Sequence, residues 1–435
     1  MRIQLLMGSI AVTIACVGLG AVAARAEEPA AEGTAAAAPA DPTRGQWDSF
    51  LDGLRDFEDN AITGTQKQVE DASKIHLSAG FTEAYMWDFN NPRSGSLIAG
   101  HSMEHHNDGV PAFGQIGAVR PSDGWFVPGF GLKLDAGKGA RDIKSDWNGN
   151  GAVAHGDTFE TNDFDVEEAY LTWTMPEDGP SALKGLTFKG GKFVTLLGAE
   201  VIEPWANFNY SRSLLFSLAI PFTHTGALVT YPITDKLTVT GGAVEGWDKV
   251  QSNNQGWSGL GNVTYTVNDQ VTLAANGIWG PEQTNKTGNK RGVGDLVATI
   301  KPTSALTLSL NYDWGHEEAA AAGNEAAIWQ GFAAVANYAF TDRASAAVRG
   351  EWFEDHGGTR TGVVQTLYEA TVTGKYLLTQ HLYGQVEYRH DESAKGNFFP
   401  ADSPGTVNGP TGPNPIRKFT SGQDIIGFDV TYVFN

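Results

Sequence analysis

Apolar and polar residues alternate along most of the chain from about residue 75 onward. In the run 306–314, leucines, a tyrosine and a tryptophan occupy the even positions, while threonine, serine, asparagine and aspartate occupy the odd ones. A period of two residues is typical of a β-strand with one apolar face. Similar runs occur at 75–89, 113–120, 125–136, 164–174, 186–193, 222–231, 237–247, 257–267, 271–279, 291–301, 328–340, 344–354, 366–376, 382–389 and 424–434. Together they predict sixteen strands, many of them near the ~9–11 residues that a tilted strand needs to cross a bilayer.

Short and long connections alternate between the predicted strands of the second half. The short ones are 232–236, 268–270, 302–305, 341–343 and 377–381, and the long ones are 248–256, 280–290, 315–327, 355–365 and 390–423. Tight turns at one end and longer loops at the other are typical of outer-membrane β-barrels. The last run must then pair with the first, because closure removes the free edges of the sheet. We therefore expect an all-β fold, a transmembrane antiparallel β-barrel of about sixteen strands.

Four segments follow from the pattern along the chain. Residues 1–26 are expected to be a signal peptide, because Arg2 precedes an apolar run that ends in the motif Ala24-Arg25-Ala26. Residues 27–45 form an Ala/Pro/Glu-rich linker that we expect to be disordered. Residues 46–73 are predicted to be a periplasmic helical segment, and residues 74–435 the barrel. The helix prediction rests on helical spacing of Trp47, Phe50, Leu51, Leu54 and Phe57.

Aromatic residues at the ends of the predicted strands indicate two girdles. Strands that run toward the long loops end on Trp87, Trp247, Trp279, Trp314 and Trp352. Strands that run back carry Tyr231, Tyr265, Tyr338, Tyr376 and Tyr432 at their inner ends. Such rings favour the headgroup level of a membrane, because one edge is apolar and the other can form a hydrogen bond. The alternative is that they are core aromatics of a soluble β-protein.

Charge and cysteine content exclude several classes of protein. The chain has 30 basic and 50 acidic residues, a formal net charge of −20. Loss of Arg2 and Arg25 with the signal peptide would leave 28 basic residues and a net charge near −22, which argues against binding to nucleic acid or anionic lipid. The only cysteine, Cys16, lies in the predicted signal peptide. Disulfides are therefore not expected in the mature chain.

A central block resembles a known family. The run 186–231, with 166–176 before it, contains an Ala-Tyr strand, a Gly-Lys-Phe strand end, a Gly-x-Glu, an Asn-x-Asn-Tyr-Ser-Arg segment and a Pro before a Thr-Gly strand. These features resemble the OmpL-like putative β-barrel porin-2 family of bacterial outer membranes. The resemblance implies a porin-like channel for small solutes over the whole barrel, without naming the solute.

Charged residues on the polar side of the predicted strands should face the lumen. They are Lys133, Asp135, Lys189, Arg349, Glu351, Glu369, Glu387 and Arg389. An Arg or Lys facing lipid at the bilayer midplane would cost roughly 2–4 kcal/mol, so we expect these residues to line water. Sixteen strands leave an interior too wide for wall side chains to fill.

The long loop 194–221 is the candidate for the pore constriction. It contains Glu200, Glu203 and Arg212, and opposed charges across a narrow opening would create a transverse field that orients dipolar solutes. Its place inside the barrel is an analogy with general porins, whose third outer loop folds inward. The alternative is an outward loop whose charges are solvated.

Two weaker motifs could bind metal ions. The segment 146–157 matches a calcium-loop spacing, with Asp146, Asn148, Asn150, Ala152 and Asp157 as ligands, although Asp stands at the last position where Glu is usual. A second cluster, 101–108, groups His101, His105 and His106 with Glu104 and Asp108, which are side chains of the types that bind zinc. Both segments are otherwise outer loops. No cofactor is expected to be required, and calcium at 146–157 is the stronger of the two candidate ions.

The sequence thus predicts a bacterial outer-membrane porin that passes small hydrophilic solutes or ions by passive diffusion. Its expected partners are outer-membrane lipid and small solutes, with no nucleic acid; a homotrimer is suggested by analogy alone. Two other classes stay open. One is a structural or adhesive barrel without an open pore, and the other is an outer-membrane enzyme, for which the sequence shows no nucleophile motif.

Overall fold

The computed structural model describes residues 44–58, 63–92, 113–147, 163–176, 178–401, 406–409, 412–415 and 418–434. The chain divides into two compact units, Met1–Phe57 and Glu58–Asn435. In the first unit, α2 (Arg44–Phe57) is an amphipathic helix on which Phe50 and Phe57 are exposed. In the second, α3 (Gly64–Ser73) precedes the barrel. None of the described helices is long and apolar enough to span a membrane.

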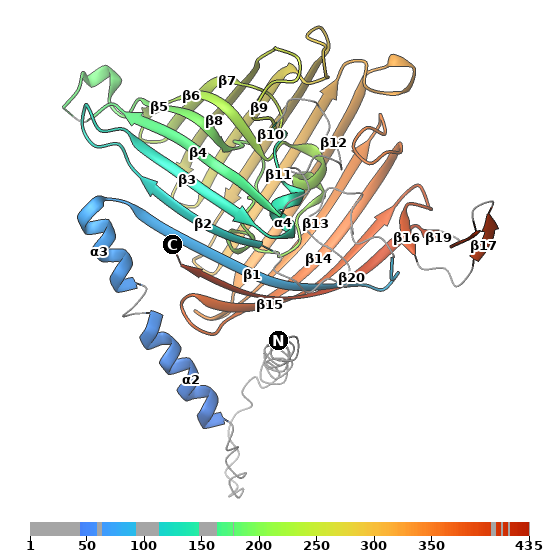
Figure 1. The fold of residues 1–435 in the computed structure, drawn as a ribbon, viewed down its shortest axis with the longest axis horizontal. Helices are drawn as coiled ribbons and strands as arrows, with labels where there is room; N and C mark the ends of the chain where they lie inside the picture. Colours follow the sequence, from blue (N-terminus) through green and yellow to red (C-terminus); the bar gives the residue numbers. More distant parts are fainter. Residues whose placement is uncertain are drawn as a thin grey trace, which may run out of the picture. The chain divides into compact units, whose positions relative to one another are not determined.

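The second unit is a closed antiparallel barrel of sixteen strands (Figure 1). Every predicted strand is present, and neighbours along the chain are neighbours in the sheet. The strands are β1 (His76–Asp88), β2 (Phe113–Arg120), β3 (Gly129–Ala136), β4 (Phe164–Thr174), β5 (Thr187–Val194), β6 (Thr223–Thr234), β7 (Leu237–Val244), β8 (Ser258–Asn268), β9 (Val271–Pro281), β10 (Lys290–Ile300), β11 (Leu306–Glu317), β12 (Ala327–Ala339), β13 (Ala344–Asp355), β14 (Gln365–Leu377), β15 (Leu382–Ser393) and β20 (Gly422–Phe434).

The barrel closes between its first and last strands, as predicted. β20 pairs with β15 on one side and with β1 on the other, with Phe81 opposite Tyr432 and Glu83 opposite Val430. The loop between β15 and β20 carries two small hairpins that the sequence did not predict. They are formed by β16 (Phe399–Ala401) with β19 (Lys418–Thr420), and by β17 (Thr406–Gly409) with β18 (Gly412–Pro415).

Shorter helical turns lie in the connections. They are α4 (Lys138–Asp142), η2 (Ser181–Leu183), η3 (Pro204–Ala206), η4 (Leu215–Ala219) and η5 (Ala322–Asn324). Several predicted strand ends differ from the structure by three or more residues, for example the end of β15 at Ser393 rather than 389, and two of these differences have a clear local cause. β3 begins at Gly129 rather than 125, because Gly124 at φ +63° and an Asp123–Val127 bridge form a tight turn. β7 ends at Val244 rather than 247, because Gly246 turns the chain at φ +131°.

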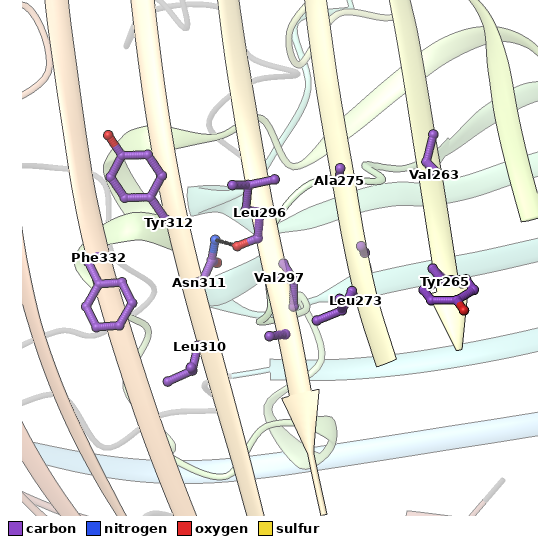
Figure 2. Close-up of a pocket in the computed structure, with 12 residues that line it drawn as sticks. Val263, Tyr265, Leu273, Ala275, Leu296, Val297, Leu310, Asn311, Tyr312 and Phe332 are labelled. Carbon is purple, nitrogen blue, oxygen red and sulfur yellow. Dashed lines mark hydrogen bonds between the residues drawn. The ribbon is translucent and has the colours of Figure 1, made fainter. Parts of the chain in front are cut away.

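The outer face of the barrel is an apolar belt. On β8 to β12, outward side chains form a shallow groove of about 460 Å³, where Leu296 and Tyr312 stand beside the small Ala275 (Figure 2). The groove lies outside the barrel wall and so is not part of the lumen. The predicted girdle residues that are exposed are Tyr265, Trp279, Trp314, Tyr338 and Tyr376, while Trp87, Tyr231, Trp352 and Tyr432 are partly exposed. Their place at the lipid headgroups stays a prediction.

Trp247 was predicted as a girdle residue, but the structure places it elsewhere. It lies beyond the end of β7, is 8% exposed, and its ring contacts Trp329 with centroids 6.3 Å apart. Trp329 is fully buried on the inner face of β12. Because Gly246 turns the chain inward, the alternation of β7 does not extend to Trp247, which belongs to the interior at the loop end of the barrel.

The inner face is not uniformly polar, in contrast to the prediction. A row of buried apolar side chains crosses the inner wall, where Leu260 is opposite Ile278 and Ile278 is opposite Val293. These residues belong to one core cluster with Leu228, Trp329, Phe353 and Leu367 of the wall and with residues of the loop between β5 and β6. Part of the lumen is therefore a packed apolar core.

Candidate functional site

The loop between β5 and β6, residues 195–222, folds into the barrel; we call it the inward loop. Its apolar stretch around η4 is almost completely buried, with Leu214 and Leu215 at 1% exposure and Leu218 at 0%. The Trp329 indole donates a hydrogen bond to the Ala219 carbonyl at 3.1 Å. An outward loop would expose this apolar stretch to water, whereas packing on the apolar row of the wall removes both surfaces from water.

Two carboxylates of the wall accept hydrogen bonds from the backbone of the inward loop. Glu351 on β13 accepts the Leu214 and Leu215 N–H groups at 2.8 and 3.3 Å. Glu387 on β15 accepts the Tyr210 and Ser211 N–H groups at 2.8 and 3.0 Å. Buried backbone donors need partners, and charged acceptors form the stronger hydrogen bonds. The two glutamates thus fix the path of the loop.

Arg349 on β13 forms the centre of this attachment. Its guanidinium donates to Glu369 at 3.0 Å, to Glu200 of the inward loop at 2.8 Å and to the Ser211 carbonyl at 2.6 Å. The side chain has no exposed surface. Arg389 on β15 adds a hydrogen bond to the Arg212 carbonyl at 2.7 Å. The inward loop is therefore attached to the β13–β15 wall through a buried network of charges.

The opposite wall holds the loop through Lys133 on β3. The ammonium group pairs with Glu203 of the inward loop, and with Glu167 and Glu168 on β4 at 3.3 and 3.1 Å. The pairing of β3 with β4 shifts by one residue next to Lys133, which is a β-bulge. Both consecutive glutamates consequently face inward, which strict alternation would forbid. The inward loop thus has attachments on β3 and on β13, two distant strands of the barrel.

These contacts correct the predicted roles of several charged residues. Most of the predicted lumen charges point inward as expected but are sealed from water, because the inward loop or a neighbouring side chain covers them. Those with 0 to 7% exposure are Asp135, Arg349, Glu351, Glu369, Glu387 and Arg389. Of the predicted constriction residues, Arg212 is 1% exposed and donates to the Tyr210 carbonyl at 2.6 Å. It folds the loop on itself and does not line water.

Other residues of the site keep contact with water. Glu200 and Glu203 each retain 12% of their side-chain surface and Lys133 retains 21%. Lys189 is partly exposed, with its ammonium 4.3 Å from the centre of the Tyr170 ring. On the inward loop, Val201 and Phe208 are 42% and 37% exposed, and the sequence did not predict Val201 as a site residue.

The predicted metal sites fall largely outside the described residues. Of the calcium ligands, Asp146 is described and its backbone pairs with Lys249, whereas Asn148, Asn150, Ala152 and Asp157 are not described. The histidine cluster at 101–108 is also outside the described residues. Within the part of the chain that the structure describes, no three His, Cys, Asp or Glu side chains are grouped to hold a metal ion.

A closed sixteen-stranded barrel with an apolar outer belt and a loop folded into its lumen is the architecture of an outer-membrane porin. The family described as "Putative beta-barrel porin-2, OmpL-like" matches residues 74–434. The chain therefore belongs to this family, and the resemblance found in the sequence is confirmed. A comparison with curated proteins gives no match.

Solved structures with the same fold are outer-membrane proteins. OmpF of Salmonella typhi, in complex with daunomycin, has a TM-score of 0.51 at 13% identity, covering 83% of this chain and 97% of that chain. The outer-membrane channel DcaP of Acinetobacter baumannii has a TM-score of 0.51 at 10% identity, with coverage of 83% and 97%. OmpT of Vibrio cholerae, in its trimer form, has a TM-score of 0.50 at 10% identity, with coverage of 83% and 99%. At these identities the likeness shows the fold alone.

Proposed function

We propose that this porin passes small hydrophilic solutes by passive diffusion through the part of the lumen that the inward loop leaves open, without a catalytic step. The observation that carries the proposal is the attachment of the loop to two walls, through Glu203 to Lys133 and through Glu200 to Arg349. A loop fixed across the lumen narrows it, and the width and charge of a constriction decide which solutes pass.

The charges that keep contact with water are of both signs. Lys133 and Lys189 lie on the β3–β5 wall, while Glu200 and Glu203 lie on the inward loop. Opposed charges of this kind favour dipolar solutes and produce weak rather than strict ion selectivity. The large negative charge of the whole chain does not set the selectivity, since field strength at the constriction depends on nearby groups.

Planar-bilayer recordings test this function. The purified protein should give steady current steps, and a salt gradient should give a reversal potential well short of the value for a perfectly selective pore. Glu203→Gln should shift the reversal potential by several millivolts in the direction of greater anion selectivity, because it removes a negative charge beside Lys133. Glu325→Gln, which alters an exposed residue of an outer loop, is the matched control and should leave it unchanged. A folded protein that gives no steady current would instead support a closed, structural barrel.

We also propose a homotrimer, by analogy with the trimer form of the Vibrio cholerae OmpT structure. Light scattering of the protein–detergent particle measures the protein mass and distinguishes a trimer from a monomer.

A further inference from the structure

A cavity of about 600 Å³ lies at the loop end of the barrel. Its walls come from the inward loop, the loops that follow β7, β9 and β13, the first residues of β10, and Asp146 in the connection after α4. This volume is in the range of small-molecule sites. None of the site residues predicted from the sequence as pore charges lines it.

Two arginines meet one tryptophan in this cavity. The guanidinium carbons of Arg291 and Arg360 lie 5.0 and 5.1 Å from the ring of Trp247, and that of Arg360 lies 5.3 Å from Trp329. Burial, together with the neighbouring charge of Arg291, lowers the pKa of Arg360 to about 10, so Arg360 stays charged at neutral pH. Two cations held this close favour a bound anion.

Two of the carboxylates that line the cavity, those of Glu282 and Asp248, accept hydrogen bonds from the protein itself. Glu282 accepts hydrogen bonds from Lys249 at 2.8 Å and from the Trp247 backbone at 3.0 Å. Asp248 accepts the Phe222 and Thr223 N–H groups at 2.6 and 3.0 Å. Outside the cavity lining, Glu317 pairs with Arg291 at 2.8 Å. These acids are held by structural partners. Glu317, Asp355 and Asp248 lie near enough to attract the Arg360 guanidinium, but none of them forms an ion pair with it in the described part of the chain.

Three side chains that line the cavity have hydrogen-bond donors without an acceptor among the described residues. Arg360 donates its Nε–H to the Leu218 carbonyl at 2.6 Å, and among the described residues its terminal nitrogens have no carboxylate within ion-pair distance. Ser217 is 2% exposed, and its hydroxyl has no hydrogen-bond partner within the described part of the chain. Lys286 is exposed at the rim. A buried hydroxyl without a protein partner calls for a further partner, such as water or a ligand.

We propose that this cavity binds a small organic oxyanion with a flat apolar body, of which an aromatic carboxylate is the simplest example. The terminal nitrogens of Arg360 and the Ser217 hydroxyl donate to the oxyanion, Lys286 adds charge at the rim, and the Trp247 ring packs against the flat body. Planar guanidinium groups bind carboxylates well, and aromatic walls favour flat ligands. The proposal deepens the proposed function by naming a solute class, and it rests on that function only for transport.

Calorimetric titration of the detergent-solubilised full-length mature protein tests the binding. Benzoate should bind saturably, whereas benzamide, which has the same shape without the charge, should not. Arg360→Gln should weaken benzoate binding about tenfold or more, because it removes a charged donor. Ser217→Ala should weaken it severalfold, and it removes no side-chain hydrogen bond to any residue that the structure describes. Arg343→Gln, an exposed arginine in the turn between β12 and β13, is the control and should bind as the wild type does.

Arg360 also contacts the inward loop, so Arg360→Gln is informative only if it folds, while Ser217→Ala keeps the test valid if it does not. No saturable benzoate binding, equal binding of benzamide, or unchanged affinity in Ser217→Ala would overturn the proposal. Inorganic phosphate bound as tightly as benzoate would overturn the role of the Trp247 ring. A protein that conducts in bilayers but does not bind benzoate would refute this inference alone, and one that binds but does not conduct would refute the channel.

Discussion

Replacing the inward loop by a short turn should raise the single-channel conductance at least about twofold, because the loop occupies part of the lumen. The change is compatible with the sheet, since Val194 and Thr223 already face each other in the β5–β6 ladder. A two-residue Asn-Gly turn after Val194 would therefore join the strands without altering their register. The conductance of single channels in planar bilayers measures the result.

The matched control shortens an outer loop that does not enter the lumen. The connection between β11 and β12 is suitable, because residues 322–326 are exposed at its tip. Its truncation should leave conductance unchanged. If the inward-loop variant folds, shown by retention of the compact form on an unheated SDS gel, and still conducts as the wild type does, the loop is not the constriction.

Arg349→Ala should destabilise the folded protein by about 3–5 kcal/mol, the usual cost of removing one partner from a buried ion pair. The variant leaves the buried Glu369 and the partly covered Glu200 without the guanidinium that they share, and it deprives the Ser211 carbonyl of its donor. Urea unfolding in detergent or lipid, followed by tryptophan fluorescence, measures the loss. We expect increased current noise as well, because the inward loop loses its attachment to β13.

Arg343→Ala is the control for charge removal. This arginine is exposed in a turn, so its loss should change the unfolding free energy by less than about 0.5 kcal/mol. The double variant Arg349→Met with Glu369→Leu should recover part of the lost stability, because apolar residues of similar volume leave fewer buried charges unpaired. Equal stability of Arg349→Ala and the wild type would show that the network does not hold the loop.

The sequence predicted the barrel well because its signal is local. Apolar and polar residues alternate along each strand, as in β11, because one face of the barrel wall contacts lipid and the other faces the lumen. The pairing of β20 with β1 follows from the need to remove the free edges of the sheet. Strand ends depended instead on backbone turns such as those at Gly124 and Gly246, which the pattern of side chains does not encode.

The site was predicted only in part, because its chemistry depends on what the inward loop covers. The alternating pattern of the strand placed Arg349 and Glu351 on the inner face. Only the folded inward loop shows that these two side chains are buried. The sequence contains one signal that could have predicted the burial of the loop. The run Leu214–Ile220 is mostly apolar although it lies in a long loop, and apolar residues such as Ile278 occupy inward-facing positions of the strands. The bulge that turns Glu167 and Glu168 inward depends on pairing with β3 and has no local signal.

Thiol accessibility tests most directly whether the inward loop lies inside the barrel. The predicted mature chain has no cysteine, so a single introduced thiol can be followed without background. Ser217→Cys is nearly isosteric and breaks no hydrogen bond of the described residues, and Lys286→Cys is its exposed counterpart in an outer loop. On intact cells, a maleimide carried on a large polyethylene glycol should label Lys286→Cys and leave Ser217→Cys unlabelled until the protein is unfolded. Equal labelling of the two folded variants would show that residue 217 is as accessible as residue 286, and would contradict the placement of the inward loop inside the barrel.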